Sequence, residues 1–172
     1  MASATRPSAG PFSPFSSRDG GNLDSFDPLA LPFWLTVGMA VLCGTVVGLE
    51  RQLRSKPVGV RTSILICLST SVFIHLGAAA SSGTGDPTRV LGQLVTGVGF
   101  LGAGVILARE GVVTGVTTAA VIWVLAAIGA SIGLGNLLGA LALALITVSV
   151  LTGVELLEAS VRWLTRGIYR RE

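Results

Sequence analysis

The sequence predicts an all-α membrane protein, a polytopic bundle of five transmembrane helices. Apolar residues make up 51% of the chain and charged residues only 12%, whereas about 25% charged residues is usual in globular proteins. Four stretches, 28–49, 62–85, 90–108 and 111–154, contain no Asp, Glu, Lys or Arg. A helix needs about 20 apolar residues to cross the hydrocarbon core of a bilayer. The first three stretches therefore suit one crossing each, and the fourth, with 44 residues, suits two.

The helix boundaries follow from these gaps and from the turn signals between them. The expected spans are 29–49, 62–81, 89–108, 112–133 and 136–154, and together they form a transmembrane domain over 29–154. Asp86 followed by Pro87 is typical of a helix start and opens the third span. Glycines around Leu134 favour a turn that divides the fourth gap. Residues 1–28, rich in Ser, Pro and Gly, are predicted to be a disordered tail.

The basic residues predict which way the bundle faces. If five helices cross, the loop 50–61, the turn 109–110 and the C-terminus share one side, with nine of the Lys and Arg residues, and the other side has three. Basic residues are enriched in the cytoplasmic segments of membrane proteins. We therefore expect the N-terminus outside and the C-terminus in the cytoplasm.

Residues 155–172 form an amphipathic basic C-terminal tail. Leu157, Val161, Leu164 and Ile168 recur at helical spacing, and the charged residues occupy the opposite face. Two interpretations are open. The tail lies as a helix on the anionic membrane surface, or it continues the fifth helix into water.

Glycines at helical spacing predict close packing between the spans. In lipid, helices approach one another where small residues leave room for the backbone. The glycines expected to pack helices are Gly44, Gly48, Gly97, Gly99, Gly102, Gly104, Gly129 and Gly133. The third span also contains a GxGxxG pattern at 97–102. It lies within an apolar span and has no acidic residue about 20 positions on, so it predicts no nucleotide site.

Polar residues at the ends of the spans are the candidate functional residues. Ionisable groups at membrane depth are costly unless they are paired or hydrated. The candidate cluster is Glu50, Arg51, Arg61, Thr62, Asp86, Arg89, Gln93, Thr117 and Thr118. Within it, we predict that Glu50 pairs with Arg61 across the first and second spans. No nucleophile–base pair, Walker motif or Cys–His cluster is present in the sequence. We therefore expect no enzyme activity, no cofactor, no metal site and no nucleic-acid partner.

Three stretches together resemble the MgtC/SapB family of bacterial membrane proteins. They are GLERQLRSKPVGVRTSILICLSTSVF (48–73), DPTRVLGQLVTGVGFLGAGVI (86–106) and GVTTAAVIWVLAAIGASIGLG (115–135). The matching positions are Glu50, Arg51, Gly59, Arg61, Thr62, Asp86, Arg89, Gln93, Gly97, Gly99, Gly102, Gly104, Thr117, Thr118 and Trp123. Ser63 and Ser69 depart from the family pattern. Several members carry a soluble domain after the membrane part, and we expect this chain to correspond to the transmembrane domain only.

The resemblance implies a multi-pass protein of the bacterial inner membrane. It also implies roles in adaptation to low magnesium, in stress and virulence inside host cells, and in membrane energetics. Two functions follow: a regulatory protein that contacts other membrane complexes, or a small ion or metabolite transporter. The acidic residues at the span boundaries favour the first, whereas the glycine-rich third span beside Thr117 and Thr118 keeps the second open. The expected partners are the lipid bilayer and other membrane proteins, and a homo-oligomer is left open.

Overall fold

The structure is a computed structural model that describes residues 28–80, 87–109 and 112–168. Residues 1–27 of the predicted disordered N-terminal tail lie outside the described residues. Asp86 and residues 169–172 lie outside them as well. Five helices are described: α1 (Leu31–Leu53), α2 (Val60–Ala80), α3 (Pro87–Gly104), α4 (Val116–Gly133) and α5 (Leu137–Ile168). Two short strands, β1 (Leu107–Arg109) and β2 (Val112–Thr114), separate α3 from α4.

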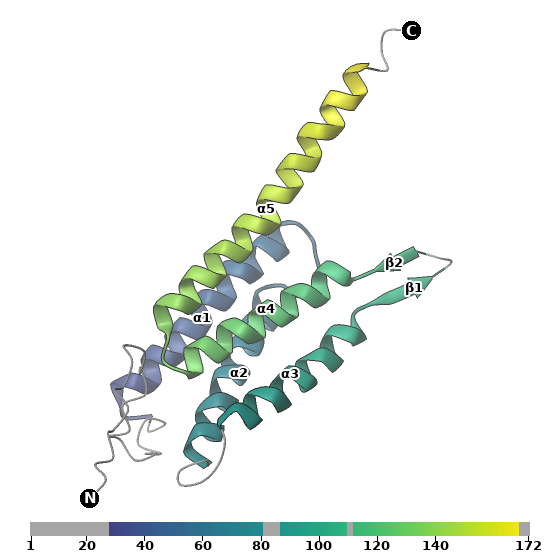
Figure 1. Ribbon diagram of the computed structural model, residues 1–172. Coiled ribbons are helices and arrows are strands. Elements are labelled where there is room, and N and C mark those ends of the chain that lie inside the picture. Colours follow the sequence, from purple (N-terminus) through teal and green to yellow (C-terminus); the bar gives the residue numbers. More distant parts are fainter. Residues whose placement is uncertain (1–27, 81–86, 110–111, 169–172) are drawn as a thin grey trace, which may run out of the picture.

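Successive helices run in alternating directions through one bundle (Figure 1). The central helix α4 contacts all four others, α1 packs against α2 and α5, and α3 lies at the side against α2 and α4. One end of the bundle is formed by the α1–α2 loop, the β1–β2 hairpin and the middle of α5. We call it the basic end, because Arg51, Arg54 and Lys56 lie there. The α4–α5 turn lies at the opposite end.

Four of the helices are long and apolar enough to cross a membrane: α1, α2, α4 and α5. The chain is therefore a membrane protein, as the composition predicts. The helix α3 has 18 residues, but Arg89, Gln93 and its glycines make it less apolar than the others. The fifth crossing and the orientation of the bundle stay predictions.

The predicted third span, 89–108, is wrong at its C-terminal end. The helix α3 ends at Gly104, and the following residues form an antiparallel hairpin in which Leu107 pairs with Thr114 and Ala108 with Val113. The start of the fourth span at 112 is wrong for the same reason, since α4 begins at Val116. An apolar run does not by itself distinguish strand from helix, and the β-branched residues on both sides of the turn favour strands.

Small residues bring α1, α2 and α4 close together. A Cβ atom at Gly44 or Gly48 would lie 2.6 Å from a backbone Cα atom of α2, and one at Gly129 would lie 2.5 Å from the carbonyl oxygen of Cys67. A Cβ atom at Gly133 would likewise lie 2.7 Å from the Cβ atom of Ile74. The side chains of the core between these helices include Ala40, Cys43, Val47, Cys67, Leu125 and Ile128, all 0% exposed. The centre of the bundle is therefore mostly apolar and closely packed.

The glycines of α3 behave differently. A Cβ atom at Gly102 would make ordinary contacts of 3.7 Å with Ala119 and Trp123, whereas Gly97, Gly99 and Gly104 have no atom of the described chain within 4 Å of that position. For these three glycines the expected helix packing is not found among the described residues.

The C-terminal tail continues the last helix. The helix α5 runs without interruption from Leu137 through Ile168 and extends well past the other helices (Figure 1). The continuity of the helix is what the second interpretation expects, and the position of the tail in water or on the membrane surface stays a prediction.

Candidate functional site

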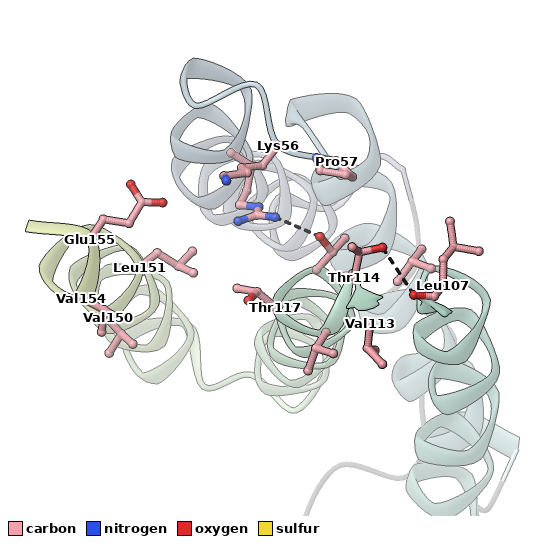
Figure 2. A pocket seen from close by; sticks show the side chains of 15 residues that line it. Lys56, Pro57, Leu107, Val113, Thr114, Thr117, Val150, Leu151, Val154 and Glu155 are labelled. Atoms are coloured by element: carbon pink, nitrogen blue, oxygen red, sulfur yellow. Dashed lines mark hydrogen bonds between the residues drawn. The ribbon is translucent and has the colours of Figure 1, made fainter. Parts of the chain in front are cut away.

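An open cavity of about 670 Å³ lies at the basic end. Its polar lining comes from four parts of the chain: Arg51 at the end of α1, Lys56 in the α1–α2 loop, Thr114, Thr117 and Thr118 around the start of α4, and Glu155 on α5. The apolar lining is Pro57, Val105, Leu107, Val113, Val116, Val150, Leu151 and Val154. Figure 2 shows Lys56 and Pro57 on one side of the opening, Thr117 on another, and Leu151 and Glu155 on α5 on a third.

Arg51 connects α1 to α4 at the inner wall of this cavity. Its Nη2 donates a hydrogen bond of 3.1 Å to Thr118 Oγ1, and the two residues are only 3% and 4% exposed. Its Nε atom is buried and has no hydrogen-bond partner among the described residues. A guanidinium has five N–H donors, so this side chain keeps bonding capacity that the described protein does not use.

Arg54 joins two carboxylates from different helices. Its Nε lies 2.6 Å from Glu50 Oε1, and its Nη1 forms an ion pair with Glu155 Oε2 on α5. The contact with Glu50 has the distance of an ion pair but not the angles of a hydrogen bond, and neither Glu50 oxygen has a hydrogen-bond partner in the part of the chain that the structure describes. The Glu50 side chain is 7% exposed and that of Arg54 is 28% exposed. One cation therefore neutralises a buried and a half-buried acid.

The predicted pairing of Glu50 with Arg61 is wrong. Arg61 is exposed at the start of α2, and Glu50 pairs with Arg54 four residues along the chain. Side chains four residues apart lie on one face of a helix. This local arrangement gives Glu50 a partner four residues along the chain, so an ion pair with α2 is not required.

The start of α4 also faces the cavity. Gly115, at the N-cap, has a φ of 89°, and a Cβ atom there would collide with the carbonyl oxygen of Val105. Because glycine has no side chain, no side-chain cap bond forms at this helix start. The first backbone bond at this helix start runs from Ala119 N–H to the Gly115 carbonyl, and among the described residues the N–H groups of Val116, Thr117 and Thr118 have no backbone acceptor. The helix thus presents unpaired donors and the positive end of its dipole.

The remaining sequence candidates do not join this cavity. Arg61, Thr62 and Arg89 are exposed and do not line it. Gln93 lines a separate, mostly apolar cavity of about 360 Å³ between α2 and α3. Asp86 lies outside the described residues. Of the nine candidates, the structure brings Arg51, Thr117 and Thr118 together around the cavity, with Glu50 one residue before Arg51.

Sequence reasoning missed four residues of the site. Lys56 and Arg54 were interpreted only as orientation signals, and Thr114 and Glu155 were not placed in the cluster. The four-residue spacing between Glu50 and Arg54 was available as a signal. The contact between Glu155 and Arg54 was not, because it joins helices that are far apart in the sequence.

The described residues contain no group of three His, Cys, Asp or Glu side chains that could hold a metal ion. The ionisable side chains of the site instead comprise three cations, Arg51, Arg54 and Lys56, and two acids, Glu50 and Glu155. This charge balance suits an anion or a polar partner surface better than a bare cation.

Comparison with known proteins gives a consistent result. The model of the MgtC family matches residues 37–160. An uncharacterised protein of Haemophilus influenzae is 37% identical over 155 residues, covering 85% of this chain and 64% of the relative. Protein MgtC of Salmonella typhimurium is 42% identical over 119 residues, covering 69% of this chain and 50% of the relative.

A third relative, from Escherichia coli K12, is named "Putative magnesium transporter YhiD". It is 44% identical over 110 residues, covering 56% of this chain and 47% of the relative. The chain thus spans about half of the length of the Salmonella and Escherichia relatives. No solved structure matches it significantly.

Proposed function

The chain belongs to the MgtC family, and on that premise we propose that it is a regulatory protein of the bacterial inner membrane. It acts through contacts with other membrane complexes during adaptation to low magnesium or envelope stress. In a pathogen, the same role contributes to virulence. It does not carry magnesium itself. The observation that carries this proposal is the separation between a polar, accessible basic end and a mostly apolar, closely packed centre.

The packed centre argues against an ion path through the chain. Magnesium loses its water reluctantly and requires oxygen ligands in near-octahedral geometry. Between α1, α2 and α4 the fully buried side chains are mainly Ala, Cys, Val, Leu and Ile. The paired acids Glu50 and Glu155 lie at the basic end and are both engaged by Arg54. A dehydrated cation would find no carboxylate pair at mid-depth among the described residues.

The basic end has the composition of a contact surface. The hairpin presents Leu107, Val112 and Val113, which are 62%, 62% and 58% exposed. Leu53, at the end of α1, is 77% exposed. Leu107 and Val113 border the same cavity as Arg51, Lys56 and the threonines, and exposed apolar residues beside polar ones are typical of interaction sites. The hairpin projects from the helices in Figure 1, where another protein can reach it.

Site-specific photocrosslinking tests the contact. A crosslinking residue at Val113 is compared with one at Leu138, which is 81% exposed at the opposite end of the bundle. We expect Val113 to capture a defined membrane protein in cells grown at low magnesium and Leu138 to capture lipid or nothing. Equal capture at both positions, or none at Val113, would contradict a contact surface at the basic end.

Transport is the alternative that the name of the Escherichia coli relative suggests, and a flux assay separates it from regulation. The purified chain is placed in liposomes and magnesium uptake is measured with wild type and Glu50→Gln. We expect no saturable flux, together with a growth defect of the deletion strain at low magnesium. Saturable flux that disappears in the Glu50 variant would replace our proposal with a transporter.

A further inference from the structure

We propose that the basic-end cavity binds a phosphate group, either on the headgroup of an anionic phospholipid or as free inorganic phosphate. The inference goes beyond the regulatory role and does not depend on it. It rests on the unused donors of a buried arginine, the open start of a helix and the apolar wall opposite them.

The cations of the cavity are available to an anion because the acids are already paired. Glu50 and Glu155 both engage Arg54, which leaves Arg51 and Lys56 as the cationic groups in the lining. Counting all five groups gives three cations and two acids, a net charge of +1. Arg51 is 3% exposed and keeps an unpartnered Nε. A guanidinium with free donors matches the geometry of phosphate oxygens.

The start of α4 adds donors on the same lining. Gly115, Val116, Thr117 and Thr118 all border the cavity, and the N-cap has no side chain to occupy the first amides. Backbone N–H groups at a helix start bind phosphate because they are unpaired and the helix dipole favours negative charge. The hydrogen bond to Thr118 holds the buried Arg51 beside these amides. The guanidinium and the helix start therefore both favour a negatively charged ligand.

The opposite wall is apolar. Val150, Leu151 and Val154 of α5 face the cavity, and Val105 and Leu107 border it beside the hairpin. A phospholipid combines an anionic phosphate with acyl chains, so this combination of basic and apolar walls fits a lipid whose headgroup reaches Arg51 and Lys56. Free phosphate would use only the polar half of the cavity.

Binding measurements on the purified full chain test the proposal. Phosphatidylglycerol binding is titrated by native mass spectrometry, with zwitterionic phosphatidylcholine as the lipid control. Inorganic phosphate binding is measured by equilibrium dialysis in detergent. The diagnostic variant is Lys56→Gln, because Lys56 is exposed and its replacement leaves the Arg51–Thr118 bond in place. Arg61→Gln is the matched control, since Arg61 is an exposed cation near the same end but outside the cavity.

We expect one saturable site, and about tenfold weaker binding in Lys56→Gln, which corresponds to about 1.4 kcal/mol. Arg61→Gln should bind like wild type, and Arg51→Gln should bind weakest. Saturable dialysis binding identifies free phosphate as the ligand, and binding of phosphatidylglycerol alone identifies the headgroup. The proposal is overturned if neither probe binds saturably. It is equally overturned if Lys56→Gln and Arg61→Gln weaken binding by the same factor, since that indicates diffuse surface charge.

Discussion

Arg51 Nη2 donates a hydrogen bond to Thr118 Oγ1 at 3.1 Å, across 67 positions of the sequence. The bond connects the last turn of α1 to the first turn of α4 at the basic end. Both side chains are almost fully buried although both border the cavity, so the bond is largely shielded from bulk water. This contact holds the wall of the basic-end cavity in place.

Thr118→Val should destabilise the protein, because it removes the acceptor and leaves a buried cationic donor unpaired. We expect a loss of about 1–3 kcal/mol in the free energy of unfolding, measured by denaturant unfolding in detergent. Thr117→Val is the matched control, since Thr117 is exposed and should change stability by less than about 0.5 kcal/mol. Equal stability of the two variants would show that the bond contributes nothing.

Arg54→Gln should destabilise the protein more than Arg61→Gln. Removal of Arg54 takes away the cation that pairs with both the buried Glu50 and the half-buried Glu155. Arg61 is exposed and pairs with neither acid. Leaving a buried charge unpaired costs about 3–5 kcal/mol, and partial exposure of Arg54 places the expected loss at about 1–3 kcal/mol.

Thermal unfolding of the two arginine variants in the same detergent gives the comparison. A double variant, Glu50→Gln with Arg54→Gln, should recover part of the stability lost in Arg54→Gln, because no unpaired acid then remains at position 50. A larger loss in Arg61→Gln than in Arg54→Gln would restore the interpretation in which Glu50 acts with α2.

The general architecture could be predicted from the sequence because charge-free length alone decides which segments can cross a bilayer. The α4–α5 turn also follows from local chemistry, namely the glycines around Leu134, whereas the start of α4 does not. The hairpin could not be predicted this way. Its residues continue the apolar stretches on both sides of Arg109 and Glu110, and apolar character alone does not distinguish a strand from a helix.

The site was predicted less well than the fold, because its contacts join distant parts of the chain. Arg51 and Thr118 were both identified as polar residues at a span boundary, but nothing local indicated that they bond to each other. The partner of Glu50 was sought across the helix interface although a closer one lay four residues away. Burial of a charge indicates that a partner exists, without identifying it.

Gly129→Ala should be costly and Gly97→Ala should not. A methyl group at Gly129 would meet the carbonyl oxygen of Cys67 at 2.5 Å and Thr70 Cβ at 2.8 Å, so α2 and α4 must separate. Overpacking of this kind costs about 1–3 kcal/mol. Gly97 has open space, and alanine there should be neutral or stabilising by up to about 1 kcal/mol. Thermal unfolding checks both, and a large loss in Gly97→Ala would show that α3 packs against another chain.

Gly115→Ala should destabilise the protein more than Gly135→Ala. Both glycines have positive φ angles, 89° and 81°, at which alanine costs about 1–2 kcal/mol. Gly135 has no neighbour within 4 Å of a Cβ atom, whereas Gly115 lies directly against the Val105 carbonyl. The hairpin must therefore move in Gly115→Ala. Unfolding midpoints measure the difference, and equal losses would mean that the hairpin adapts freely.

The last prediction concerns the side of the membrane on which each loop lies. A bundle of five crossings and a bundle of four crossings place Val113 and Leu134 on different sides relative to Lys56. Lys56 and Val113 line one cavity, so the structure favours placing the α1–α2 loop and the hairpin on the same side, with Leu134 opposite. This requires α3 to cross, and its 18 residues extend about 27 Å, close to the hydrocarbon thickness. If α3 did not cross, Lys56 and Leu134 would share a side and Val113 would be opposite.

Single cysteines at Lys56, Val113 and Leu134, labelled with a membrane-impermeant maleimide before and after permeabilisation, decide between these arrangements. All three native residues are exposed, whereas Cys43 and Cys67 are 0% exposed and should give little background. We expect Leu134→Cys to react from outside, and Lys56→Cys and Val113→Cys to react only after permeabilisation, because basic loops stay in the cytoplasm. Reaction of Lys56→Cys and Leu134→Cys from the same side would instead establish four crossings. The cavity would then have to form across the bilayer, which no arrangement of α1, α4 and the hairpin in this fold permits.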